Sequence, residues 1–401
     1  MNTLIYNNRR QKLHLNILGF VLAMPILVDF FSVIVQQMGL SSSSKITLML
    51  YCISLATILF RILRVTKKRE LIKDVSIYML SLSPFLLNYI FFEETRKSIV
   101  GQEMLIVYFF YIFLAVFSIR RINSWDLFFE SLLKPGELAI ALAVFILLFL
   151  DYEKYLVYMG FSYALLPFIC NFYRTARCEK KQSKKRKCYA YFLAGLFSIL
   201  SFGARAAIAL VGVYIVVFEL SRNDLSPSIK VLSLSLLFIM VWIIGENLNE
   251  IAEWLIGFNA FKDSYLLKNL LTGRIFESKS RDVLYKSCFR RLSEMGLSIS
   301  GFFGDRKYCA GFAYPHNIFL EVLMSFGWIF GTLLIIGYIG LIIKCLAQNR
   351  SAVREVSIFI IISMLARYLI SGSYLTEGKF WIATALIVGL SGNKIVETNN
   401  A

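Results

Sequence analysis

Long apolar runs, separated by short charged segments, are the feature of this chain that most restricts its fold. Lipid offers no partner to open backbone groups, so a segment that crosses the hydrocarbon needs about twenty apolar residues in a helix. The pattern therefore predicts an all-α polytopic membrane protein with about twelve transmembrane helices. The expected spans are residues 15–38, 46–64, 75–92, 102–119, 136–151, 155–173, 189–203, 205–220, 229–246, 316–344, 355–372 and 379–392.

The composition supports this interpretation, because 58% of the residues are hydrophobic and only 17% are charged. A formal net charge of +17 could indicate nucleic-acid binding. The basic residues, however, gather in loops on alternate sides of the apolar runs, most plainly from Lys180 to Lys187. The positive-inside bias explains this better, places both termini in the cytoplasm and leaves no nucleic-acid partner expected.

One polar segment interrupts the apolar pattern. Residues 1–247 hold the first nine spans, residues 248–315 form a large outer loop with short helices, and residues 316–401 hold the last three spans and a cytoplasmic tail. Most of the remaining chain is apolar, so we expect the chemistry in and beside this loop. Cys288 and Cys309 share the loop and could form a disulfide if it lies outside the cytoplasm.

His316 is the histidine available for chemistry on the outer side, since the other one, His14, belongs to the cytoplasmic leader. It follows Pro315 and opens the tenth span, at the outer membrane boundary. An imidazole with a pKa of about 6.5 can take a proton from an attacking hydroxyl. The alternative is an interfacial histidine satisfied by a backbone carbonyl.

Three arginines have similarly open interpretations. Arg281 falls in the first turn of a helix expected near Ser280, where the helix dipole disfavours a cation but an anion would be held. Alternatively, its stem covers apolar surface while its head reaches water. Arg205 stands among small residues at the outer end of the eighth span, and Arg367 lies inside the eleventh. Each is either functional or paired structurally, for example with Asp29.

Two sequence motifs are absent, and their absence restricts the reactions that we expect of this chain. There is no Gly-x-x-x-x-Gly-Lys-Ser/Thr loop for nucleotide hydrolysis, and no clustered Asp/Glu pair on the outer side resembles a metal or glycosidase site. Several guanidinium groups and one imidazole at an outer membrane face remain. This set suits a lipid-linked pyrophosphate, with arginines neutralising phosphate and the histidine acting on a hydroxyl.

Together with the expected topology, three local motifs resemble the O-antigen polymerase and O-antigen ligase superfamily of bacterial inner membranes. The likeness covers the whole length in architecture: about twelve spans, cytoplasmic ends and a large periplasmic loop between the ninth and tenth spans. The motifs are Ser201-Phe202-Gly203-Ala204-Arg205-Ala206, Ser280-Arg281-Asp282-Val283-Leu284-Tyr285 leading to Gly301 and Gly304, and Pro315-His316-Asn317-Ile318-Phe319-Leu320-Glu321 leading to Gly327 and Gly331.

Within this superfamily, ligases carry a histidine followed by Asn, Ser or Gln, nine residues, a Gly-x-x-Gly pair and commonly two threonines. Here Gly327 fits, but Gly331 comes one position late and Thr332 stands alone. This departure favours a polymerase over a ligase. The Arg-x15-Gly pattern described for some polymerases is not recognisable, because Arg281 and Arg274 lack glycine at that spacing.

The resemblance implies a metal-independent glycosyltransferase without a cofactor, which moves a growing glycan from undecaprenyl pyrophosphate to a sugar hydroxyl of a lipid-linked repeat. His316 would orient or deprotonate that hydroxyl. Arg281 and Arg205, with Arg274 or Arg367 in support, would hold the pyrophosphate leaving group. A polysaccharide chain-length regulator is a candidate partner. The alternatives are a ligase that transfers the glycan to lipid A–core, and a flippase or exporter of lipid-linked sugars.

Overall fold

The computed structural model is helical throughout the residues it describes and contains no strand there, which confirms the predicted all-α class. The described residues are 2–39, 43–101, 105–120, 122, 124–150, 158–222, 226, 228, 230, 235, 248–257, 268, 271–272, 279–348 and 350–392. Arg274 and all of the ninth expected span except residues 230 and 235 lie outside them.

The helices are given in chain order. The first half of the chain forms α1 (Asn2–Gln37), α2 (Ser43–Val65), α3 (Lys68–Phe91), α4 (Glu93–Gly101), α5 (Leu105–Ile119), α6 (Trp125–Phe149), α7 (Tyr158–Cys178), α8 (Gln182–Phe202) and α9 (Arg205–Ser221). The second half forms α11 (Leu248–Ile256), α13 (Lys279–Met295), η1 (Arg306–Tyr308), α14 (Ile318–Leu346), α15 (Ser351–Ile360), η2 (Ile361–Leu365), η3 (Ala366–Leu369) and α16 (Lys379–Ser391).

Within the described residues, five helical segments are long and apolar enough to cross a membrane. They are Lys12–Gln37, Lys45–Val65, Lys68–Phe91, Trp125–Phe149 and Ile318–Leu346. Two shorter apolar helices, Tyr108–Ile119 and Lys379–Ser391, accompany them. These helices are compatible with a membrane protein, and the count of twelve spans stays a prediction.

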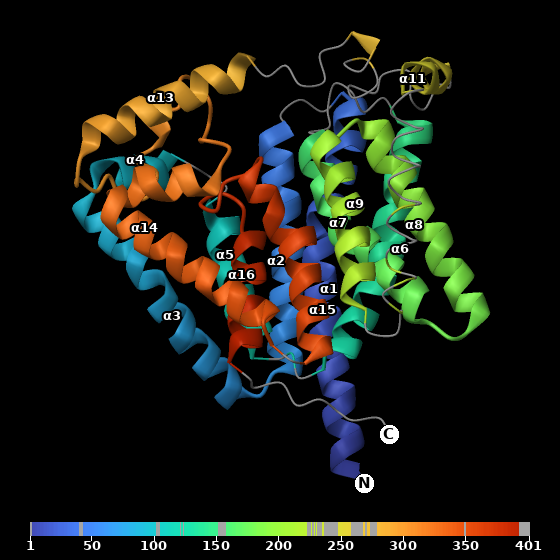
Figure 1. Ribbon diagram of the computed structural model, residues 1–401. Helices are drawn as coiled ribbons and strands as arrows, with labels where there is room; N and C mark the ends of the chain where they lie inside the picture. Colours follow the sequence, from blue (N-terminus) through green and yellow to red (C-terminus); the bar gives the residue numbers. More distant parts are fainter. Residues whose placement is uncertain are drawn as a thin grey trace.

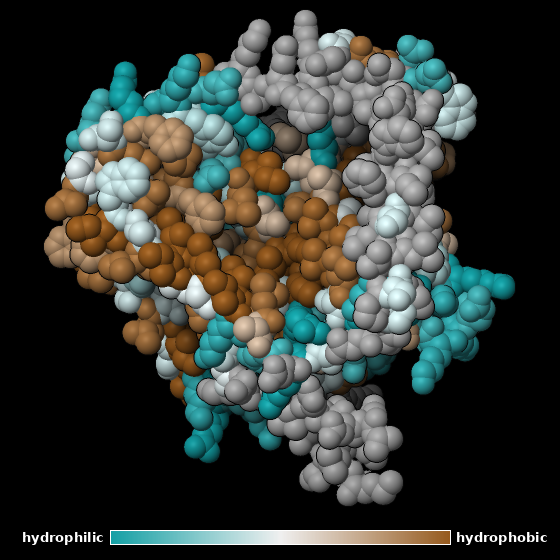
Figure 2. Space-filling view, viewed as in Figure 1, coloured by the Kyte–Doolittle hydropathy of each residue, from teal (hydrophilic) through white to brown (hydrophobic). Residues whose placement is uncertain are grey.

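The helices stand side by side in one bundle (Figure 1). α1 runs through its middle, α6 to α9 stand on one side, and α2, α5, α15 and α16 stand on the other. α3 and α14 form an outer flank, which α13 and α4 cover at one end. Apolar side chains dominate the middle of the face in Figure 2 and polar ones its two ends, as a bilayer-embedded protein requires.

One proline inside a helix lies where a second helix packs closely against it. Pro135 lies inside α6, which begins at Trp125 rather than at the expected residue 136. A proline donates no backbone hydrogen bond, so the carbonyl of Ser131 loses its helical partner. Gly19 of α1 packs against that carbonyl so closely that a Cβ there would lie 2.6 Å from the oxygen. The glycine therefore lets α1 and α6 approach at the break in α6.

The two ends of the bundle differ. α1 begins and α16 ends at one end, and α13 crosses the opposite end (Figure 1). The basic residues from Lys180 to Lys187 precede and open α8 at the end where α1 begins. The N-terminus and the most basic loop thus share a side, which is the arrangement that the predicted cytoplasmic N-terminus requires.

Candidate functional site

Two glycines fold the outer loop back onto α14. Gly327 breaks α14 with φ 72° and ψ 176°, and a Cβ there would lie 2.7 Å from the carbonyl oxygen of Ser298. At the break, the carbonyl of Ser325 accepts hydrogen bonds from the amides of Ser300 (3.0 Å) and Gly301 (2.9 Å). Gly301 has φ +76° and packs on the ring of Phe92. Only glycine adopts such conformations without strain, so these motif glycines fix the position of the loop.

His316 stands at the start of α14 in a left-handed conformation, with φ 57°. Asn317 caps the helix, because its Oδ1 accepts from the amides of Phe319 (3.0 Å) and Leu320 (3.2 Å). Its Nδ2 donates to the carbonyl of Leu369 at 3.1 Å. A histidine at positive φ is uncommon, and such strain concentrates at functional sites.

The imidazole of His316 is half-buried beside Tyr314, with the ring centroids 4.3 Å apart. Its Nδ1 is buried and has no hydrogen-bond partner among the described residues. The structure therefore does not support the alternative in which a backbone carbonyl satisfies this nitrogen. Burial lowers the pKa of His316 below its usual 6.5, and the positive charge of Arg281 lowers it further. The ring is therefore neutral at pH 7 and can accept a proton.

Arg281 and Arg367 belong to two different elements and share a neighbour. Arg281 lies in the first turn of α13, and its charge acts on both His316 and Tyr163 of α7. The guanidinium of Arg367 lies 4.6 Å from the ring centroid of the same Tyr163 and pairs with Glu377 at 2.7 Å. Arg281 thus connects His316 electrostatically with Tyr163, and Arg367 contacts Tyr163 directly.

The roles of the other two arginines proposed from the sequence stay predictions. Arg205 opens α9 after Gly203, which ends α8 with φ 76°. Arg274 lies outside the described residues.

A buried polar network beside His316 was missed by the sequence analysis. Arg306 donates to Asp305 (2.5 Å), to Glu321 of α14 (2.8 Å) and to Ser373 (2.8 Å). Glu321 is 1% exposed and also accepts from Ser373 and from the amide of Tyr374. Burial raises the pKa of Asp305, while the charge of Arg306 opposes that rise. The network fastens the outer loop, α14 and the turn after η3 together, and so positions His316.

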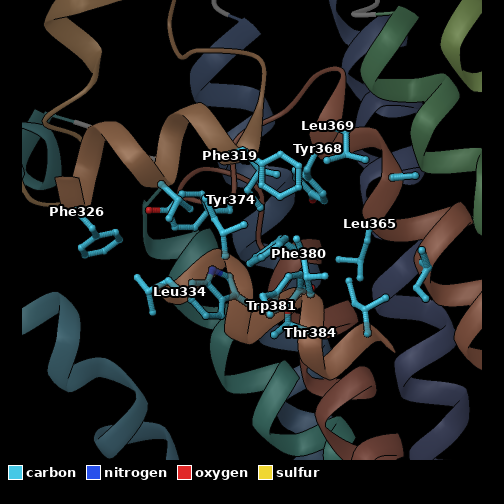
Figure 3. Close-up of a pocket in the computed structure, with 18 of the residues that line it drawn as sticks. Phe319, Phe326, Leu334, Leu365, Tyr368, Leu369, Tyr374, Phe380, Trp381 and Thr384 are labelled. Atoms are coloured by element: carbon cyan, nitrogen blue, oxygen red, sulfur yellow. The ribbon is translucent and has the colours of Figure 1, made fainter. Parts of the chain in front are cut away.

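Two cavities adjoin the site. An apolar cavity of about 500 Å³ lies between α14 and the α15–α16 region, and Figure 3 shows the rings of Phe319, Tyr368, Phe380 and Trp381 around it. A smaller cavity of about 280 Å³ has polar walls that include Asp29 and Arg367. Asp29 forms no ion pair with an arginine among the described residues, contrary to the pairing considered from the sequence. No group of three His, Cys, Asp or Glu side chains in the described ranges could hold a metal ion.

Cys288 of α13 and Cys309 are buried in one small cluster, and the thiol of Cys309 donates to the backbone carbonyl of Asp305 at 3.2 Å. If the loop lies outside the cytoplasm, we expect a disulfide between them in the cell. After free thiols are blocked in denatured membranes, reduction should expose two thiols that accept a maleimide-linked mass tag. A Cys288→Ser/Cys309→Ser variant should accept no tag, and an untagged wild-type chain would show that the pair stays reduced.

The chain was also compared with known proteins. No protein-family model matches it, and a search of curated proteins finds no match either. Function must therefore be argued from the chemistry of the site.

Proposed function

We propose that this protein is a polysaccharide polymerase of a bacterial inner membrane. It transfers a growing glycan from undecaprenyl pyrophosphate to a sugar hydroxyl of a lipid-linked repeat unit. The observation that carries the proposal is the half-buried imidazole of His316 at the loop end of a helical bundle, with its pKa lowered by burial and by the charge of Arg281, while Arg367 contacts Tyr163, on which Arg281 also acts. A hydroxyl nucleophile needs a base, and a pyrophosphate leaving group needs positive charge.

The proposed step uses both parts of the site. The acceptor oxygen attacks the anomeric carbon of the donor glycan and loses its proton to His316. The bond from that carbon to the pyrophosphate oxygen breaks, and its electron pair stays on the pyrophosphate. Arg281 stabilises the charge that develops there, and Arg367, which already pairs with Glu377, supports it as a hydrogen-bond donor suited to phosphate. Arg281 supplies positive charge in place of the divalent cation that other glycosyltransferases use, so we expect chelators to leave the activity unchanged.

The apolar cavity suits the polyprenyl tails of these substrates. Phe319, in the first turn of α14, and Leu369, at the end of η3, line it. Both lie close in sequence to polar groups of the site, since Phe319 follows His316-Asn317 and Leu369 follows Arg367. A pyrophosphate held by Arg367 would therefore have apolar surface beside it for the first isoprene units.

A ligase would use the same donor and the same base, so the acceptor must separate the two functions. The purified protein, reconstituted into liposomes with its lipid-linked repeat as both donor and acceptor, should produce a ladder of lipid-linked polymers. Formation of product only after addition of lipid A–core would identify a ligase. Absence of product, with movement of the lipid-linked repeat across the bilayer, would identify a flippase.

The pH dependence of this reaction should report the pKa of His316. The base acts only when neutral, so the rate should fall as the pH falls through a value below 6.5. Arg281→Gln removes a positive charge that lowers this pKa, so the residual rate should fall off at a higher pH than in the wild type. Initial rates in liposomes, measured from neutral to acidic pH, give the pH at which the rate falls in the wild type and in Arg281→Gln.

The matched control is Arg290→Gln, which changes an exposed arginine of the same helix. It should change neither the rate nor the pH at which the rate falls. If the rate falls at the same pH in the wild type and in Arg281→Gln, Arg281 does not act on the catalytic base.

A further inference from the structure

The polar cavity beside Arg367 has no part in the proposed transfer of the glycan. Its volume is about 280 Å³, and it lies among α1, α2, α5, α7 and the segment that joins η3 to α16. Its walls are Pro25, Asp29, Tyr51, Tyr108, Tyr111, Gly160, Ala164, Arg367, Thr376, Glu377, Gly378 and Lys379.

The charges on these walls balance. Arg367 and Glu377 form an ion pair, so each is neutralised by the other. Asp29 and Lys379 act on each other electrostatically, yet no hydrogen bond or ion pair joins them in the described part of the chain. The cavity therefore offers the carboxyl group of Asp29 and the amino group of Lys379 without direct contact between them. A neutral ligand with several hydroxyls could donate to Asp29 and accept from Lys379, whereas an anion or a cation would gain no net attraction.

Two further polar atoms on the walls lack partners. Tyr111 is 4% exposed and Arg367 is 9% exposed. The hydroxyl of Tyr111 and the Nε of Arg367 are buried without a hydrogen-bond partner among the described residues. Buried polar atoms are almost always satisfied, so these two indicate a bound group that supplies the partners.

The tyrosines also contribute aromatic surface. The hydroxyl of Tyr108 is already engaged, because Trp381 Nε1 donates to it at 2.5 Å and it lies 3.2 Å from the carbonyl oxygen of Tyr374. Its ring and that of Tyr51 remain as amphipathic walls. Aromatic faces next to hydroxyl-binding charges suit a ligand with apolar C–H faces and polar edges, which is the surface of a sugar ring.

We propose that this cavity is a saccharide subsite, which holds one neutral sugar of the lipid-linked repeat next to the reacting bond. Arg367 lines the cavity and also contacts Tyr163, on which Arg281 acts, so a sugar bound here lies beside the proposed pyrophosphate position. The identity of the molecule that carries the sugar rests on the proposed function. The preference for a neutral polyhydroxyl ligand rests on the walls of the cavity alone.

The test measures binding without catalysis. The probe is the repeat oligosaccharide released by mild acid from the lipid-linked repeat of the host strain. Isothermal titration into the full-length protein in nanodiscs should show binding to the wild type and to His316→Ala. Lys379→Met and Asp29→Asn should each weaken it about tenfold or more, as expected for hydrogen bonds to charged groups.

Tyr111→Phe serves as a variant that loses only a hydroxyl, and should weaken binding severalfold while the protein keeps its melting temperature. Tyr78→Phe, a tyrosine of α3 outside both cavities, is its matched control and should bind as the wild type does. Wild-type affinity in Asp29→Asn, Lys379→Met and Tyr111→Phe would overturn the subsite. So would an absence of saccharide binding to the wild type, or displacement of the saccharide by inorganic pyrophosphate at equal affinity.

The two proposals fail in different ways. Loss of saccharide binding in the cavity variants, together with normal polymer from His316→Ala, would support the subsite and contradict the polymerase mechanism. Loss of polymer in His316→Ala, with saccharide binding unchanged in the cavity variants, would support the mechanism and contradict the subsite.

Discussion

Replacement of His316 by asparagine is expected to lower the rate of polymer formation by a factor of about 10²–10⁴, the usual contribution of a general base. Asparagine adopts positive φ more readily than most residues, so it can keep the left-handed conformation of His316 while removing the basic nitrogen. The loss should therefore appear in the rate and not in the amount of folded protein. Initial rates with the purified lipid-linked repeat in liposomes measure it.

The matched control is the second histidine of the chain. His14 is buried in α1 and lies 3.4 Å from the hydroxyl of Thr66, at a hydrogen-bonding distance. His14→Asn should retain a rate near that of the wild type. A normal rate in His316→Asn, at equal protein level, would remove His316 from the mechanism.

Replacement of Arg306 by leucine is expected to have the largest effect on stability. The guanidinium is the cation that both Asp305 and Glu321 contact, and these carboxyl groups are 0% and 1% exposed. Loss of one partner from a buried charge network typically costs about 3–5 kcal/mol, because the remaining charge stays buried. We expect a lower melting temperature in nanodiscs and faster proteolysis within the outer loop.

Two further variants separate charge from packing. Arg306→Leu combined with Asp305→Asn and Glu321→Gln removes the unpaired charges, so it should recover much of the lost stability. Arg290→Ala, at an exposed arginine, should change stability by no more than about 0.5 kcal/mol. Equal melting temperatures for Arg306→Leu and Arg290→Ala would show that the network does not hold the loop in place.

The sequence was sufficient to predict the helical class, and local patterns also singled out His316 and Arg281, whose roles stay predictions. Apolar runs of helical length report membrane burial directly. His316 follows a proline at the start of an apolar run, and Arg281 opens a short helix in the only long polar segment. In the structure, this helix (α13) packs on the start of α14. Leu284 of α13 and Leu320 of α14 belong to one buried cluster.

Other parts of the site depend on contacts between distant segments, which periodicity does not encode. Glu321 was written within a motif, but its partner Arg306 lies fifteen residues earlier and Ser373 fifty-two residues later. The eleventh span is also irregular, since α15 passes into a π-helical turn (η2) and then a 3₁₀ turn (η3) that carries Arg367. Such turns often mark functional positions, and an apolar run does not reveal them.

The small residues around Arg205 have a structural use that the sequence alone did not show. They permit close helix packing, which favoured a functional role for Arg205. In the structure, Gly203 ends α8 and Arg205 opens α9, so Gly203 serves this connection, and the role of Arg205 stays a prediction. Asp29, which was expected to pair with an arginine, lines a cavity.

The most direct test of the central claim is the ladder of surface glycan from the host strain. The gene is deleted and then restored as the wild type or as His316→Asn, with equal protein in the membrane. We expect the deletion and His316→Asn to give core with a single repeat, and the wild type to restore the ladder. A full ladder from His316→Asn, or a deletion in which polymerised lipid-linked glycan accumulates without reaching the core, would contradict polymerisation by this site.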